Sequence, residues 1–349
     1  MQGREKAQKA LFGTLPLEEL LPLDHPLRKI RADFDAAYAR LAHAFETNYG
    51  TTGNVSIPTP ILIRAWLLMA LYSIGSERAL CEQITMNAGF RWFVGLDWDD
   101  KVFDHSTLSK NRERVFGSGA AEAVLGEVVR IAQSRRLLSS DRLVVDGTTI
   151  KAWASMKSFK ANDGSEDDKP NFKGSKRSNQ THSSKTDPDA RLLRKGKGQE
   201  SMLCHIGHAL VDAASGLVRA CRVTKACGMG GNPEVIAALD MAKEHMEPGQ
   251  TLIADRGYDE DRFVSGLREQ GIQAHPRAKK QNSSLDGRTT KRPSYEESLK
   301  RRYIAEPVFG WIKNRGRMRQ TMLRGTEKVD WQFQLYCTAY NLRRMAKAA

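Results

Sequence analysis

The order of segments after Arg142 constrains the fold of this chain more than any other feature of its sequence. Short β-branched runs alternate there with stretches of helical periodicity. We predict strands at 143–146, 203–212, 216–224, 251–255 and 271–275, with helices at 233–247 and 261–270 and a helical region after 295. The second and third strands form a predicted hairpin. This order predicts an α/β fold, in which helices flank a mixed sheet that contains an antiparallel hairpin.

The first 135 residues are predicted to form a separate all-α domain. Apolar residues recur there at helical spacing in three segments, 34–45, 61–74 and 120–131. The remaining residues, 136–349, form the second predicted domain.

A short basic helix is predicted within 104–114, capped by Asp104 or Ser106. Its surroundings are compatible with a helix-turn-helix, in which Ser106, Lys110 and Arg112 would read the end of a DNA. Two short helices around a turn also occur in most all-α domains, so both interpretations stay open.

A polar segment at 157–200 interrupts the strands of the second domain. It is rich in Lys, Asp, Ser, Gly and Asn and nearly lacks apolar residues, so we expect it to form no core of its own. We interpret it as a mobile surface insertion. The basic run 191–197 leaves a phosphate-contacting loop as the alternative.

Positive charge dominates the chain and concentrates near its C-terminal end. The 55 Lys and Arg exceed the 41 Asp and Glu, which gives a net charge of +14. Residues 277–324 alone carry 14 basic and four acidic side chains. Because each Lys or Arg that neutralises a phosphate releases counterions, such a segment favours salt-sensitive binding to a nucleic acid backbone.

Several other classes of protein are disfavoured. The apolar run 61–74 is too short to cross a bilayer and contains Arg64, and charged residues interrupt 1–20, so we expect neither a membrane span nor a secretory signal. A cytoplasmic location follows as the expectation. The glycines at 228–231 lack the spacing of a dinucleotide or phosphate loop, so no nucleotide cofactor is expected.

Two aspartates occupy corresponding places in the predicted sheet. Asp146 ends the apolar run that begins at Leu143, and Asp255 ends the run that begins at Leu252. Side chains at strand ends are held by a rigid framework and still reach solvent, which is where ligands gather in α/β sheets. Either aspartate alone is more often a turn-forming residue, but the pair in a basic protein points to a site.

A third acid is proposed from the segment 302–313. If this segment is helical, Arg302, Glu306 and Lys313 project from one face, while Ile304, Val308 and Trp311 or Ile312 pack inward. The alternative is an ordinary surface ion pair on an amphipathic helix.

These residues resemble those of bacterial insertion-sequence transposases of the DDE type, in particular the fifth insertion-sequence family. The resemblance covers nearly the whole chain and rests on the stretches 145–149, 184–191, 206–210, 253–258, 302–313 and 339–343. It implies a ribonuclease-H-like catalytic core in which Asp146, Asp255 and Glu306 are the catalytic, metal-binding triad.

The resemblance also implies phosphate-binding roles for Arg302 and Lys313, which flank the third acid. We assign the same DNA-binding role to five further basic residues, Lys151, Arg256, Arg315, Arg317 and Arg319. Two departures from the related pattern concern this segment: Leu299 replaces an expected Tyr, and Pro307 follows Glu306 directly. Since proline disfavours helical geometry in the residue before it, Glu306 is expected at a helix start or kink, with Glu296 or Glu297 as substitutes.

The implied chemistry is metal-dependent DNA cleavage followed by strand transfer. Two Mg²⁺ ions, or Mn²⁺ in their place, suit carboxylate ligands, with Asp146 bridging both ions and the other two acids each completing one site. Water would attack at the end of the insertion sequence, and the released 3′-hydroxyl would then attack target DNA. The expected partners are the terminal inverted repeats and the target DNA, bound by a homodimer associated with the bacterial nucleoid. A catalytically inactive DNA-binding relic and a nuclease that cuts without joining remain the alternatives.

Overall fold

The computed structural model describes residues 15–47, 55–117, 119–139, 141–162, 177–194, 196, 198–226 and 232–348. The chain divides into two compact units. The first comprises 1–137, 311–317 and 335–349, and the second comprises 138–310 and 318–334. Much of the predicted insertion (163–176, 195 and 197) and the glycines at 228–231 lie outside the described residues.

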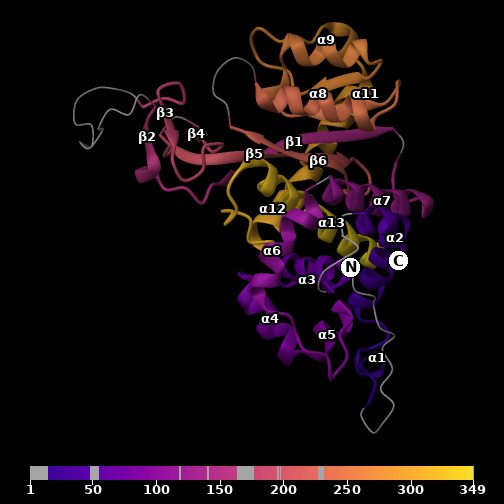
Figure 1. Ribbon diagram of the computed structural model, residues 1–349. Helices are drawn as coiled ribbons and strands as arrows, with labels where there is room; N and C mark the ends of the chain where they lie inside the picture. Colours follow the sequence, from indigo (N-terminus) through magenta and orange to yellow (C-terminus); the bar gives the residue numbers. More distant parts are fainter. Residues whose placement is uncertain are drawn as a thin grey trace. The chain divides into compact units, whose positions relative to one another are not determined.

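The N-terminal part of the first unit is helical, as its apolar periodicity predicts. Its helices are α1 (Leu17–Leu20), α2 (Pro26–Glu46), α3 (Thr59–Tyr72), α4 (Glu77–Met86), α5 (Ala88–Val94), α6 (His105–Phe116) and α7 (Ala120–Ser134) (Figure 1). Of the two predicted caps of the basic helix, Asp104 is the one observed, and its Oδ1 accepts a hydrogen bond of 2.8 Å from the Ser106 amide.

No single helix among the described residues is long and apolar enough to cross a membrane. Helices α3 and α4 reach the length and apolar composition of a membrane span only when taken together, and the chain bends by 96° at the break between them.

The second unit is built on a six-stranded mixed sheet. Its strands are β1 (Arg142–Lys151), β4 (Arg191–Leu193), β5 (Met202–Asp212), β6 (Val218–Lys225), β7 (Thr251–Ala254) and β8 (Gln273–Pro276). β5 pairs antiparallel with β1, β4 and β6, whereas β7 pairs parallel with β1 and β8. The order β6-β5-β1-β7-β8 gives the mixed, ribonuclease-H-like sheet with an antiparallel hairpin that the sequence predicts.

Helices cover this sheet and bury one continuous apolar core. α8 (Pro233–His245) packs on β5 and β6, and α9 (Asp261–Glu269) packs on α8 and β8 (Figure 1). Alternate residues of the strands, such as Leu143 and Val145 of β1, face these helices because the side-chain period of a strand is two. The C-terminal elements are α10 (Gly287–Thr290), α11 (Pro293–Arg301), a 3₁₀ turn η3 (Arg302–Ala305), α12 (Glu306–Asn314) and α13 (Thr326–Ala348).

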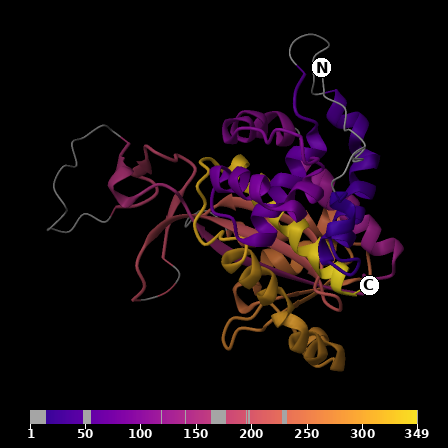
Figure 2. The same ribbon diagram turned by 90° about the horizontal axis from the view of Figure 1, so that it is seen from below.

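The described part of the predicted insertion contributes Phe159 and Ala190 to a small core that it shares with residues outside the insertion. Two short strands, β2 (Phe159–Ala161) and β3 (His182–Ser184), pair with each other and lie to one side of the main sheet in both views, beyond the 3₁₀ turn η1 (Met156–Ser158) (Figures 1 and 2). Phe159 is buried with Ala154, Ala190 and Leu203. The basic run proposed as a phosphate-contacting loop begins with β4, which pairs with β5. Ala152, Ala154 and Leu203 of this core lie outside 157–200, so a mobile insertion without a core of its own stays a prediction.

A close approach of β5 to α13 explains why position 207 is glycine. A Cβ atom built on Gly207 would lie 2.9 Å from the ring of Phe333, closer than real Cβ contacts. We expect Gly207→Ala to lower the free energy of unfolding by about 1–3 kcal/mol through overpacking. Urea denaturation measures this, with Gly126→Ala as the matched control. Gly126 lies on an exposed part of α7 with no atom within 4 Å of the added carbon, so the control should raise stability. Equal effects of the two variants would contradict this explanation.

Candidate functional site

Asp146 lies inside β1, not at its end as predicted. The parallel pairing of β1 with β7 stops at Val144, but β1 continues to Lys151 because residues 147–151 stay paired with β5. Asp146 is therefore the second residue beyond the parallel pairing. It is half-buried, and its Oδ1 accepts a hydrogen bond of 2.8 Å from the Gly147 amide.

Asp255 follows the last residue of β7, as predicted. Its exposed carboxylate caps the 3₁₀ turn η2 (Arg256–Tyr258), with Oδ1 accepting a hydrogen bond of 2.7 Å from the Arg256 amide. Since β1 and β7 are neighbouring parallel strands, the structure brings Asp146 and Asp255 to the same end of adjacent strands. The two acids are 109 positions apart in the sequence.

Arg302 lies next to this strand end, and Glu306 follows it at the start of α12, so the two do not share one helix as predicted. Arg302 begins η3, which packs against β1, and α12 begins at Glu306. The Arg302 Nη1 donates a hydrogen bond of 2.8 Å to Asp255 Oδ1, and its guanidinium carbon lies 4.2 Å from the centre of the Tyr303 ring. The predicted helix start at Glu306 is correct. Pro307 then falls in the first turn, where a missing amide hydrogen costs nothing, and Glu306 keeps helical angles.

The two substitute acids lie elsewhere. Glu297 Oε2 forms an ion pair of 2.9 Å with Nη2 of Arg142, the first residue of β1, and thus lies at the opposite end of the parallel pairing from Asp146. Glu296 is exposed on α11. The Glu306 side chain is exposed and makes no hydrogen bond or ion pair with any described residue, which leaves its carboxylate open to a ligand.

The donor set fits hard divalent cations, because carboxylate oxygens are the ligands that Mg²⁺ and Mn²⁺ take. Within the described residues, the three acids do not bring one oxygen each to within 4.8 Å of one another. A single ion held by all three therefore does not fit this arrangement, whereas two ions about 3.5–4 Å apart require ligands over a wider span. Asp255 Oδ2 accepts no hydrogen bond in the described part of the chain.

Two side chains that the sequence did not single out also border this place. Glu234 lies in the first turn of α8, and its Oε1 would be 3.3 Å from a Cβ atom built on Gly147. Tyr258 lies at the end of η2 and is fully buried. Burial raises the pKa of the Tyr258 hydroxyl well above 10, and the charges of Glu234, Asp146 and Asp255 raise it further. Nothing in the sequence distinguishes Glu234 from an ordinary acid at a helix start.

The basic residues assigned to DNA divide between the two units. Lys151 and Arg319 adjoin each other in the second unit, where the Lys151 amide donates a hydrogen bond of 3.0 Å to the Arg319 carbonyl oxygen. Both side chains are exposed, as is Arg256. Lys313, Arg315 and Arg317 belong to the first unit; Lys313 lies in the last turn of α12, and the other two are exposed.

The three residues proposed to read a DNA end all lie on α6, in different states. Arg112 forms an ion pair with Glu77 of α4, whose Oε1 also accepts a hydrogen bond of 3.1 Å from Trp66. Ser106 is half-buried beside its capping residue, and Lys110 is exposed. Lys110 is thus the member of this set that is most open to a partner.

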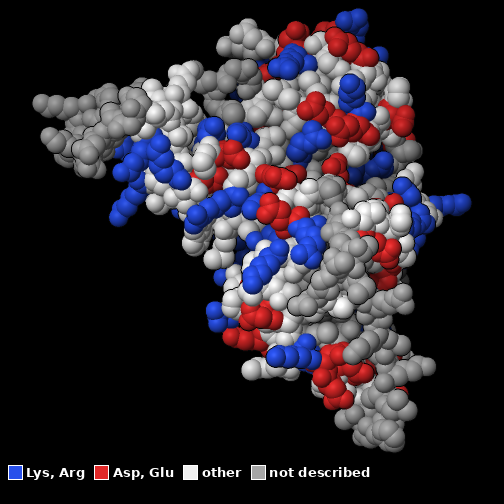
Figure 3. All heavy atoms as spheres, in the orientation of Figure 1, with Lys and Arg blue, Asp and Glu red and all other residues white. Residues whose placement is uncertain are grey.

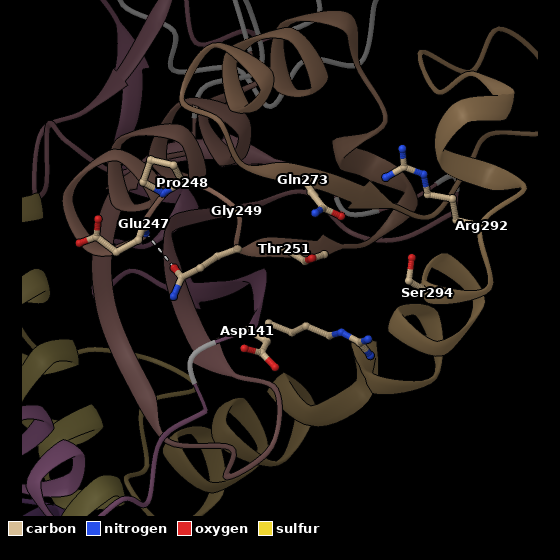
Figure 4. A pocket seen from close by; sticks show the side chains of 10 residues that line it. Asp141, Glu247, Pro248, Gly249, Thr251, Gln273, Arg292 and Ser294 are labelled. Atoms are coloured by element: carbon tan, nitrogen blue, oxygen red, sulfur yellow. Dashed lines mark hydrogen bonds between the residues drawn. The ribbon is translucent and has the colours of Figure 1, made fainter.

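Charged side chains are mixed over most of the face seen in Figure 3, and Lys and Arg gather over β2 and its neighbours. A cavity of about 720 Å³ lies at the opposite end of the parallel strands from the acids. It is lined by Asp141, Gly249, Thr251 and Gln273 near the starts of β1, β7 and β8, and by Arg292 before α11 (Figure 4). The acids are therefore not part of this cavity.

Comparison with known proteins identifies the family. The model of the transposase DDE domain matches residues 138–342, more than half of the chain, and the model of a transposase domain (DUF772) matches residues 15–114. No curated protein matches the chain.

Two solved structures are similar to the chain at low levels. One is the piggyBac transposase synaptic complex with hairpin DNA, at 7% identity and a TM-score of 0.44 over 93% of this chain and 76% of that chain. The other is the Mos1 transposase paired-end complex with left transposon end, at 9% identity and a TM-score of 0.20 over 88% of this chain and 84% of that chain. Neither likeness carries weight at these scores, and the assignment rests on the family models: the chain belongs to the family of transposases with a DDE domain.

Proposed function

We propose that this transposase cleaves DNA at the ends of its insertion sequence and joins the released 3′ ends to target DNA. One observation carries the proposal: Asp146 and Asp255 lie at the same end of adjacent parallel strands, and η3 packs on β1 directly before Glu306. Family membership supplies the reaction class, and the position of these acids supplies the candidate residues.

In this proposal the three acids hold divalent cations, and the neighbouring basic side chains bind the DNA. Divalent cations bound by Asp146, Asp255 and Glu306 would activate the attacking oxygen and stabilise charge on the five-coordinate phosphorus. Arg302 holds Asp255 in place through its ion pair and offers its remaining N–H groups to a phosphate. Lys151, Arg256 and Arg319 are exposed in the same unit and contact the backbone of the bound DNA.

DNA is the proposed partner, and two protomers are proposed to act together. Both ends of an insertion sequence must be joined to one target, so a dimer would hold the two ends. Because the binding surface is basic, affinity for DNA is expected to fall steeply as salt rises.

A labelled DNA end tests the proposal. The purified chain is incubated with its own terminal repeat and a target plasmid, with Mg²⁺ or with EDTA. Metal-dependent nicking followed by labelled plasmid supports the proposal. Nicking without labelled plasmid identifies a nuclease that does not join, and binding without nicking identifies an inactive relic.

Arg302 is expected to support the reaction without being essential. We expect Arg302→Ala to lower the cleavage rate about 10–100-fold, the usual cost of removing a group that orients a metal ligand. Arg302→Lys keeps the charge but loses the planar fork, so its loss should be smaller. Rates measured over a range of Mg²⁺ concentrations should show that part of the Ala defect disappears at high Mg²⁺. Full activity of Arg302→Ala at every concentration would remove Arg302 from the site.

A further inference from the structure

Glu234 approaches the predicted triad from the opposite side of β1. The side chains of Leu143 and Val145 face α8, so the next residue of that face is Gly147, beside which the Glu234 carboxylate lies. Asp146 lies on the other face of the strand because successive side chains alternate, so the two carboxylates can share an ion only at the edge of β1 beyond Val144, where the pairing with β7 has ended. The glycine therefore leaves the space through which a carboxylate from α8 reaches the strand next to Asp146.

The start of α8 is tied to the turn that carries Asp255. Asn232 caps the helix by accepting a hydrogen bond of 3.1 Å from the Glu234 amide. Its Nδ2 donates to the Gly257 carbonyl oxygen in η2 and to Glu260 Oε1, each at 3.4 Å. The cap thus fixes Glu234 relative to the segment that follows Asp255.

A buried hydroxyl without a partner lies within electrostatic reach of these acids. Tyr258 is 1% exposed, and its hydroxyl makes no hydrogen bond to any described residue. Three carboxylates, those of Glu234, Asp146 and Asp255, are near enough to raise the pKa of this hydroxyl. A buried hydroxyl among three acids is costly unless it donates to one of them or to a bound water or ion.

A second unsatisfied atom faces the same position. His208 pairs with Gly147 across the strands, and its Nδ1 would lie 3.5 Å from a Cβ atom built on that glycine. This nitrogen is buried and has no partner among the described residues, while Nε2 is bonded to Thr224 Oγ1 at 2.8 Å. Burial lowers the pKa of His208 to about 3, so the ring is neutral and adds no positive charge to offset the acids.

We propose that Glu234 is a fourth carboxylate of the metal site, binding a divalent cation together with Asp146. The inference rests on the proposed function and extends it by one ligand. Tyr258 and His208 would then position this ligand set, since each has a buried polar atom without a partner close to it. A cation would also offset the mutual repulsion of the carboxylates of Glu234, Asp146 and Asp255.

Direct binding of Mn²⁺ tests the proposal without any DNA. Free Mn²⁺ is measured by electron paramagnetic resonance during titration of the full chain and of three variants, Glu234→Gln, Asp146→Asn and Glu269→Gln. Glu269 is an exposed acid on the neighbouring helix α9, which makes it the matched control for loss of one charge. We expect binding to weaken at least about 10-fold in the first two variants and to stay unchanged in the third.

The outcomes distinguish a failure of the fourth ligand from a failure of the metal site as a whole. Weaker binding in Asp146→Asn with unchanged binding in Glu234→Gln would overturn the fourth ligand and leave the proposed function intact. Unchanged binding in both variants would contradict the metal site as a whole.

Thermal unfolding distinguishes a ligand from a residue that only stabilises the start of α8. If Glu234 only stabilises the start of α8 as a first-turn acid, Glu234→Gln should lower the melting temperature of the chain in EDTA. If Glu234 is instead one of several crowded metal ligands, Glu234→Gln should leave the melting temperature in EDTA unchanged or raise it. The same variant should show a smaller increase in melting temperature when Mn²⁺ is added. Glu234→Asp, which keeps the charge one methylene shorter, should bind Mn²⁺ with intermediate strength. A lower melting temperature in EDTA with an undiminished response to Mn²⁺ would overturn the proposal.

Discussion

Asp146→Asn is expected to lower the rate of DNA cleavage by more than about 100-fold. Mutating a group that only supports a metal ligand costs about 10–100-fold, so removing a charged ligand itself should cost more. Asn keeps the shape of the side chain and the oxygen that accepts from the Gly147 amide, so the fold should be preserved. Asp255→Asn should behave in the same way, with its ion pair to Arg302 weakened as well.

Two measurements make this expectation specific. Cleavage of the labelled end gives the rate, and gel shift of the same DNA in EDTA gives binding, which should remain within a few-fold of that of the unmodified chain. Asp141→Asn serves as the control because Asp141 is an exposed aspartate just before β1, at the other end of the strand. Retained cleavage in either site variant would remove that aspartate from the reaction, and an equal loss in the control would point to a general defect of charge or folding.

Local sequence patterns predicted most of the second unit. The strands β5 to β8 and the helices α8 and α9 appear within a few residues of their predicted bounds, because each combines an apolar period with a turn signal such as Pro233. The length of β1 was underestimated. Glycine is disfavoured in strands, so Gly147 gave no sign that β1 continues, and the pairing with the long strand β5 extends β1 to Lys151.

The helix proposed to carry Arg302, Glu306 and Lys313 shows the limit of spacing arguments. The periodicity predicted correctly that Val308, Trp311 and Ile312 are buried. It missed the 3₁₀ turn η3, which places Arg302 beside Asp255 instead of on the helix with Glu306. A few residues of 3₁₀ and α-helix have nearly the same side-chain period, so the break depends on packing against β1.

Contacts between segments far apart in the chain could not be predicted from local sequence patterns. Glu234 and Gly147 are separated by 87 positions, and their proximity follows from the packing of α8 across β1 and β5. The basic segment 277–324 was predicted as one DNA-binding block, but residues 311–317 belong to a different compact unit from the rest. Composition detects the charge of such a block and not its division in space.

The buried aspartate Asp212 is expected to be as important for stability as the acids are for catalysis. It is 0% exposed, and its carboxylate accepts five hydrogen bonds. Oδ2 accepts from the amide and hydroxyl of Ser139 before β1, and Oδ1 accepts from the Ala214 amide and from the amide and hydroxyl of Ser215. One side chain therefore joins the entry of β1 to the turn between β5 and β6.

Asp212→Ala should lower the free energy of unfolding by about 3–5 kcal/mol, since three amide groups lose a charged acceptor at once. This corresponds to a decrease of roughly 10 °C in the melting temperature. Asp240→Ala is the matched control, because Asp240 is half-exposed on α8 and its contact to Arg222 is a surface ion pair of 3.5 Å. Surface pairs contribute about 0–1 kcal/mol, so the control should change little. If calorimetry gives the two variants similar melting temperatures, Asp212 does not hold the start of β1, and the position of Asp146 must depend on the pairing of β1 with β5 alone.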